Sequence, residues 1–200
     1  MNPVTKRLTV MAMLVALSVV LVSLIHFPLF PAAAFLEYDP ADIPILIGAF
    51  AYGPVAGLVL TAVACLIQGL TVSAQSGLYG IIMHFIATSS LVLVASTLYR
   101  VRHTRVGAVL GLVCGTVSMG LIMMVANHFI TPYFMSTSPD SFAAMQQATD
   151  SMLLPVILPF NLLKAGINSS VTFLVYKAVS RYLVHGETEK SGSKTAEEKI

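Results

Sequence analysis

The sequence has 200 residues, of which 56% are hydrophobic and only 10% are charged, and its mean hydropathy is +0.85. Soluble domains carry about 25% charged residues, so this composition excludes a soluble protein and a sizeable soluble domain. The net charge of +2 gives no reason to expect a nucleic-acid partner. Cys65 and Cys114 lie within apolar runs and indicate neither a disulfide framework nor a metal site. We predict an all-α membrane protein.

The first apolar run extends from Leu8 to Phe27, about the 20 residues that a helix needs to cross a bilayer. Two prolines, Pro28 and Pro31, end it. Ala12 and Ala16 are four residues apart and therefore lie on one face of this helix. Small residues at this spacing let a second helix approach closely in lipid, although alanine pairs also arise by chance in membrane helices.

The next stretch, from Leu36 to Gly57, begins polar and then becomes an apolar run that Gly53-Pro54 interrupts. Its polar part holds three carboxylates and two prolines: Glu37, Asp39, Asp42, Pro40 and Pro44. Carboxylates between apolar segments must reach water, so they predict a loop at the membrane surface. This loop, residues 28–43, is either a solvated connection or an ordered lid.

The run from Ile43 to Leu70 fits either one kinked span or two short helices hinged at Gly53-Pro54. Later spans are predicted at Leu78 to Tyr99, Gly107 to Phe134 and Met152 to Tyr182. Two short helices give six helices in total. With six helices all three basic clusters lie on the cytoplasmic side, as the positive-inside rule requires. The basic clusters are Lys6-Arg7, Arg100 to Arg105, and Lys177 with Arg181. We therefore predict six helices, a short second helix that its neighbours shield, and cytoplasmic termini.

The segment from Met135 to Ser151 is polar and external in this topology, and its middle is predicted to form a short surface helix capped by Ser138 or Asp140. The tail, residues 186–200, is charged and nearly free of apolar residues, which predicts a disordered cytoplasmic segment. Residues 1–185 are therefore expected to form a single transmembrane domain.

Polar residues inside the last span carry the functional argument, because such side chains are costly in hydrocarbon without a partner or a cavity. Asn161, Lys164 and Asn168 share one face, and the spans contain no acid to pair with the lysine, so we expect Lys164 to lack a countercharge. We favour an outward-facing cavity over a lysine that extends to the surface. Pro155 and Pro159 are expected to kink or unwind the start of this helix.

Three further polar side chains are candidates for the same cavity. Asn127, near the end of the fifth span, offers both a donor and an acceptor to a heterocycle, or an ordinary hydrogen bond between helices. His84 in the fourth span fits either a structural contact between helices or a ligand contact. Gln68 lies at the outer end of the third span, where it could line the mouth.

An intramembrane enzyme is the main alternative from another class. Asp39 and Asp42 have a D-x-x-D spacing that could present two carboxylates to a divalent metal on a helix, but Pro40 and Pro44 make a helix there unfavourable. A second acidic motif, a hydrolase motif and a nucleotide-binding motif are absent from the sequence. We therefore expect no catalytic residues, no metal and no cofactor, and any coupling to ATP must come from partner subunits.

The block from Leu36 to Gly57 resembles the signature of riboflavin-specific S components, the substrate-binding membrane subunits of energy-coupling-factor (ECF) transporters. The resemblance covers residues 1–185. It implies a six-helix fold in the bacterial plasma membrane and high-affinity riboflavin binding in a pocket near the outer surface, gated by loop 28–43. The partners implied are a transmembrane coupling subunit, which would dock at Ala12 and Ala16, and two ATPase subunits.

The resemblance also implies the residues that bind the vitamin. Asn127, Asn161 and Lys164 match the family's flavin-contacting positions, and the remaining candidates are Leu36, Tyr38, Asp39, His84 and Gln68. His84 stands where an asparagine is usual, which leaves riboflavin and FMN as alternatives. An S component for another vitamin, and a scaffold whose Asn161 and Lys164 are paired within a closed core, also stay open.

Overall fold

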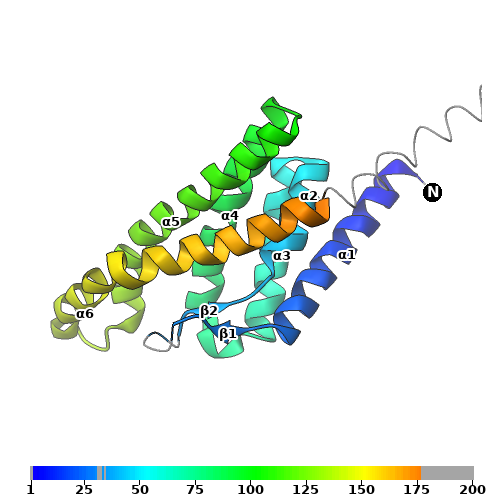
Figure 1. Cartoon of the computed structure of the whole chain (residues 1–200). Helices are drawn as coiled ribbons and strands as arrows, with labels where there is room; N and C mark the ends of the chain where they lie inside the picture. Colours follow the sequence, from blue (N-terminus) through cyan, green and yellow to red (C-terminus); the bar gives the residue numbers. More distant parts are fainter. Residues whose placement is uncertain (1, 31–32, 34, 177–200) are drawn as a thin grey trace, which may run out of the picture.

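A computed structural model describes residues 2–30, 33 and 35–176 of the chain as a bundle of six helices, with a two-stranded hairpin at one end (Figure 1). The helices are α1 (Pro3–Leu24), α2 (Asp42–Tyr52), α3 (Pro54–Leu70), α4 (Gly77–Val101), α5 (Arg105–Met135) and α6 (Pro139–Met152), which continues to residue 176. The strands are β1 (Phe27–Pro28) and β2 (Glu37–Tyr38). This is the predicted all-α membrane fold. Pro31, the end of the last span beyond residue 176 and the predicted tail lie outside the described residues.

Four helices of the described part are long and apolar enough to cross a membrane: Pro3–Leu24, Ala74–Val101, Arg105–Met135 and Pro139–Tyr176. The predicted pair of short helices is confirmed, because α2 and α3 meet at Gly53 with Pro54 as the first residue of α3. Gly53 has a φ of +92°, in a region that L side chains rarely adopt, so glycine is required at this hinge. Proline suits the first helical position because the N–H it lacks would have no helical partner there.

The short helix α2 lies inside the bundle, as predicted. Its residues from Asp42 to Phe50 are all buried, and Ile45 and Leu46 are completely inaccessible. A helix that is apolar on every side belongs in a protein interior. By contrast, α1 buries only Val15, Ser18 and Val22, and Ala12 and Ala16 lie on its exposed side.

Small residues bring α4 and α5 close together. A β-carbon at Gly111 would lie 2.6 Å from the carbonyl oxygen of Ala95, and one at Gly115 would lie 2.8 Å from that of Leu91. Such contacts are shorter than carbon and oxygen tolerate, so glycine at both positions permits this packing. These two helices form one wall of the space described below.

The last helix differs from the prediction. The expected surface helix and the expected last span form one continuous helix, Pro139–Tyr176, with a π-helical segment at Leu153–Ile157. The wider π turn lies where Pro155 and Pro159 cannot donate backbone hydrogen bonds, so the prolines unwind the helix locally without ending it. Ser138 caps the start of α6, as predicted.

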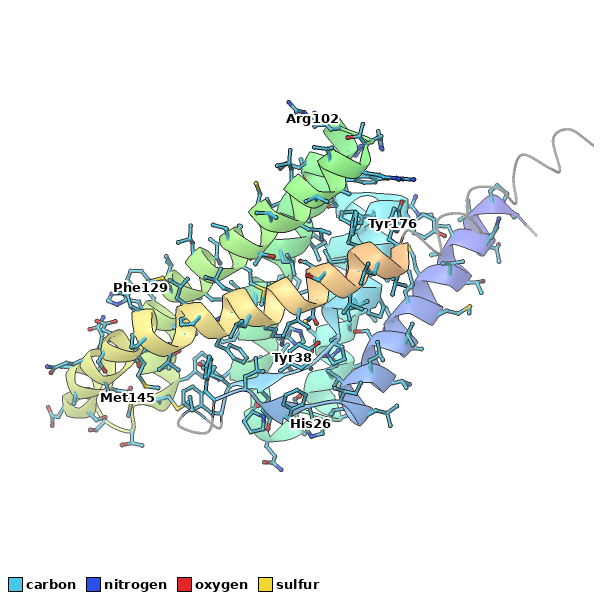
Figure 2. All side chains as sticks on the ribbon, viewed as in Figure 1. His26, Tyr38, Arg102, Phe129, Met145 and Tyr176 are labelled. Carbon is cyan, nitrogen blue, oxygen red and sulfur yellow. The ribbon has the colours of Figure 1, made fainter. Side chains whose placement is uncertain are left out.

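The two ends of the bundle differ in chemistry. Arg102 lies in the α4–α5 connection at one end, and His26 lies beside the β-hairpin at the other (Figure 2). We call these the basic end and the hairpin end. β1 pairs with β2 in antiparallel register, Phe27 opposite Tyr38 and Pro28 opposite Glu37. The sequence predicted only a loop here, and the pairing places Phe27–Pro28 directly beside Glu37–Tyr38.

Candidate functional site

A cavity of about 190 Å³ lies at the hairpin end, between residues 35–39 and helices α3, α4, α5 and the last helix. Its apolar wall includes Met83, Met119, Met123, Ile81 and Phe160. Pockets that hold small molecules combine such walls with a few convergent polar groups. The three methionines add flexible surface that adapts to the shape of a ligand.

Seven of the eight predicted binding residues line this cavity. They come from four helices and from the segment before α2: Leu36, Asp39, Gln68, His84, Asn127, Asn161 and Lys164. Tyr38, the eighth, lies behind the wall, and its hydroxyl donates to Asn168 Oδ1 at 3.0 Å. In Figure 2 Tyr38 lies between β2 and the last helix. Burial, aided by the neighbouring Asp39 and Asp42 carboxylates, raises the pKa of the Tyr38 hydroxyl and keeps it a donor.

Lys164 does have a countercharge, so the expectation of an unpaired lysine is wrong. Its Nζ lies 2.6 Å from Asp39 Oδ2, and both side chains are largely buried. The spans themselves supply no acid to this lysine. Instead, the chain after β2 returns into the bundle and carries Asp39 to it. A buried ammonium and carboxylate at this distance stabilise each other only as a pair, because either alone would be an uncompensated buried charge.

Asn168 ties the same segment to the last helix. Its Nδ2 donates to the backbone oxygen of Asp39 at 3.0 Å and to Asp42 Oδ2 at 2.9 Å. The other carboxylate oxygen of Asp42 accepts from Thr88 Oγ1 at 2.6 Å. From α1, Ser18 Oγ donates to the backbone oxygen of Ala41 at 2.9 Å. Residues 38–42 are therefore an ordered segment held by three helices, which favours the predicted lid over a solvated connection.

The amides that line the cavity keep hydrogen-bonding capacity for a ligand. Asn161 donates to the backbone oxygen of Ile157 at 2.8 Å, and its side-chain oxygen accepts no hydrogen bond from any described residue. Asn127 donates to the Met123 carbonyl at 2.7 Å and accepts from Thr131 at 2.9 Å. Each amide offers two donor hydrogens and two lone pairs, so neither is saturated.

His84 lines the same cavity, but its Nε2 faces the Asp42 carboxylate. Its Nε2 is buried, makes no hydrogen bond to the described residues and lies 3.8 Å from Asp42 Oδ1. Buried polar atoms nearly always have a partner, and the polar group nearest to this nitrogen is the Asp42 carboxylate. The position of His84 agrees with the predicted contact between helices, here α4 and α2, and the ligand contact stays a prediction.

The enzyme and scaffold alternatives fit this geometry less well. Asp39 and Asp42 bind Lys164, Asn168 and Thr88. These partners occupy the oxygens that a metal would need. The scaffold alternative correctly expected a partner for Lys164, but the space beside it is a cavity and not a closed core.

Sequence reasoning missed the methionine wall. Met119 and Met123 precede Asn127 by eight and four residues, so the three side chains share one face of α5. Met83 adjoins His84 on α4. Their spacing of four and eight residues from Asn127 was the sequence signal that could have identified these two methionines as cavity residues.

Comparisons with known proteins agree with the fold. Residues 6–176 match the family described as "ECF transporter, substrate-specific component". The chain is 27% identical to the riboflavin transporter FmnP of Bacillus subtilis, over 86% of this chain and 90% of that protein. It is 28% identical to the riboflavin transporter RibU of Staphylococcus aureus, over 89% of this chain and 92% of that protein.

A solved structure of the S component of a bacterial ECF transporter superposes with a TM-score of 0.76 and 27% sequence identity, covering 90% of this chain and 98% of that one. The family match extends over most of the chain and includes every helix that forms the cavity. This protein is therefore a multi-pass membrane protein that belongs to the substrate-specific components of ECF transporters.

Proposed function

We propose that this chain binds riboflavin in the cavity at the hairpin end and is the substrate-capture subunit of an ATP-driven vitamin transporter. The observation that carries the proposal is the convergence of Asn127, Asn161 and Lys164 on one methionine-lined cavity. The isoalloxazine ring of riboflavin is flat, with an apolar benzenoid edge and a pyrimidine edge rich in donors and acceptors. Apolar walls with a few fixed polar groups suit such a ring.

Residues 28–43 act as the gate in this proposal. The cavity of about 190 Å³ is smaller than the roughly 300–1,000 Å³ typical of pockets for small molecules, so a flavin enters only if the lid moves outward. Asp39 holds the lid to Lys164, and Asn168 holds it at two further points. In this proposal the ligand also contacts Lys164, so its binding site includes the residue to which Asp39 attaches the lid.

The transport step is assigned to partner subunits. The sequence has no nucleotide-binding motif, and transport by the chain would depend on a transmembrane coupling subunit and two ATPase subunits. Ala12 and Ala16 lie on the exposed side of α1, where small side chains allow a partner helix to approach closely. The basic end would face the cytoplasm of a bacterial cell and the hairpin end the outside. Riboflavin is then cargo, neither cofactor nor substrate of a reaction.

A fluorescence titration tests the binding proposal. Flavins are excited by visible light, which protein side chains do not absorb, so flavin emission can be followed directly in detergent. We expect a saturable change at one riboflavin per chain, and no displacement by excess thiamine or biotin. Unchanged riboflavin emission at micromolar protein would contradict the proposal, and displacement by another vitamin would indicate an S component with a different cargo.

A further inference from the structure

A hollow of about 430 Å³ lies on the outside of the bundle, between α5 and the last helix, in the half nearer the basic end. Among the described residues, its lining has no member in common with the cavity at the hairpin end. Its rims are apolar and exposed, with Val109, Val113 and Val117 on α5 and Leu174 on the last helix. Figure 1 shows these two helices diverging with distance from α6. We call this hollow the α5 groove.

Gly166 keeps the α5 groove open on the side of the last helix. A β-carbon at this position would meet no heavy atom within 4 Å, apart from its chain neighbours and the backbone of its own helix. By contrast, a β-carbon at Gly111 or Gly115 would collide with α4. Gly166 is therefore not needed for packing among the described residues, and the room that it leaves is available to another molecule.

The polar side chains that line the α5 groove are engaged within the protein. The hydroxyls of Thr116 and Ser169 lie 3.2 Å apart, so one donates to the other. Ser170 Oγ donates to the backbone oxygen of Gly166 at 2.7 Å. None of the described lining residues is charged. The groove therefore suits hydrocarbon better than a polar ligand, which would lose its hydrogen bonds to water without gaining new ones.

The dimensions of the α5 groove favour an alkyl chain over a helix of a partner protein. Its α5 lining runs from Val109 to Val117, which is about 12 Å of helix. Spread over this length, a volume of about 430 Å³ corresponds to a groove roughly 6 Å across. A helix with its side chains is about 10–12 Å across, so it could lie on the rims but could not enter. An alkyl chain has no side chains and can enter.

Arg105 supplies a positive charge at the basic end of the α5 groove. It precedes Val109, Leu112 and Thr116 by four, seven and eleven residues, so it lies on the face of α5 that lines the groove. Arg105 is exposed and forms no ion pair with another described residue. The headgroup of a lipid lies just beyond its acyl chains, and Arg105 lies about one helical turn beyond the groove, where it is placed to meet a headgroup.

We propose that the α5 groove binds one anionic phospholipid, with an acyl chain between α5 and the last helix and the phosphate at Arg105. Basic side chains beside a hollow between membrane helices recognise anionic headgroups, and a guanidinium can pair with two phosphate oxygens at once. In the proposed orientation the basic end faces the cytoplasm, so the lipid belongs to the inner leaflet. This inference goes beyond the proposed function and does not depend on the identity of the cargo.

The test measures Kd for dioleoyl-phosphatidylglycerol and dioleoyl-phosphatidylcholine by native mass spectrometry of the delipidated protein in detergent. The two lipids have identical acyl chains, but the first is anionic, whereas choline neutralises the phosphate of the second. We expect phosphatidylglycerol to bind about fivefold more tightly, because one arginine near an anionic headgroup contributes roughly that factor. Arg105→Gln should bring the ratio of the two Kd values close to one.

Arg100→Gln is the matched control for charge. Arg100 is an exposed arginine in the last turn of α4, at the same end of the bundle. Its guanidinium lies near Gly53, at the hinge between α2 and α3, and does not line the groove. The Kd ratio of this variant should equal that of the wild type. An equal fall of the ratio in both arginine variants would overturn the inference, because the lipids would then respond only to the total charge of the basic end.

Two groove-filling variants test the acyl-chain site. Gly166→Leu places a side chain in open space, and Ser170→Leu replaces an exposed hydroxyl one turn later, so both should bind the two lipids several-fold more weakly. Cys114→Leu is the control, because Cys114 is exposed on α5 and lies outside the described lining, and it should bind both lipids like the wild type. Thermal unfolding checks the fold of each variant, and Ser170→Leu decides the question if Gly166→Leu does not fold.

Three results would overturn the inference. The first is equal Kd values of the wild type for the two lipids, and the second is wild-type lipid binding in the groove-filling variants. If those variants also failed to assemble with a transmembrane coupling subunit, the groove would belong to a partner helix. The third is a dimer of the wild-type chain that is lost in both groove-filling variants, which would assign the groove to a second copy.

Discussion

Replacing Lys164 with alanine is expected to weaken riboflavin binding about 100-fold. The ammonium lies in the wall of the cavity at the hairpin end and is also the ion-pair partner of Asp39 at 2.6 Å. Breaking a buried pair by removing one partner costs roughly 3–5 kcal/mol, and every 1.4 kcal/mol is tenfold in affinity. Part of this free-energy cost lowers the stability of the folded protein. We therefore expect the loss of binding free energy to lie at the lower end of this range of roughly 3–5 kcal/mol. The measurement is the Kd for riboflavin from flavin fluorescence.

Two variants make this result interpretable. Leu163→Ala removes an exposed side chain one residue earlier on the same helix and should leave the Kd within about twofold of the wild type. Lys164→Met keeps most of the side-chain volume, so a loss as large as that of alanine would assign the effect to the charge. Wild-type affinity in Lys164→Ala would remove this residue from the binding site.

Replacing Asp42 with alanine is expected to destabilise the protein by about 3 kcal/mol, a fall in Tm on the order of 10 °C. The carboxylate is completely buried at the start of α2 and accepts from Thr88 and Asn168, one donor on each oxygen. Its removal leaves the Thr88 hydroxyl and one amide hydrogen of Asn168 buried without these partners, and Asn168 also holds the lid. Thermal unfolding in detergent, followed by circular dichroism, gives the comparison.

Asp140→Ala is the control for this prediction, because it removes an exposed carboxylate from the same end of the bundle. Its favourable interaction with the helix N-terminus is worth about 0.3–1 kcal/mol, so its Tm should fall by only a few degrees. An Asp42→Ala protein that unfolds at the wild-type temperature would show that the buried network does not hold the lid segment to the bundle.

Much of the helical framework could be predicted because it depends on local properties of the chain. The apolar runs have the lengths of membrane helices, and only glycine tolerates the backbone at Gly53, so the division into α2 and α3 follows from a few neighbouring residues. The spacing of Asn161, Lys164 and Asn168 placed them on one face of the last helix for the same reason.

The contacts of the lid could not be predicted, because they join residues far apart in the sequence. Asp39 and Lys164 are separated by 125 positions, and nothing near either residue indicates the other. The pairing of β1 with β2, which precedes the lid segment, has only two residues in each strand and is too short to leave an alternating pattern. The continuity of α6 with the last span could likewise not be predicted, because prolines usually end a helix. Here a π turn accommodates them.

The most direct test of the central claim is a structure of this protein determined with riboflavin. We expect the three-ring system in the cavity at the hairpin end, with its pyrimidine edge within hydrogen-bonding distance of Asn161 and Lys164. We also expect residues 38–42 to be displaced from their positions in the ligand-free protein. A flavin bound elsewhere on the bundle, with the methionine-lined cavity unchanged, would contradict the account.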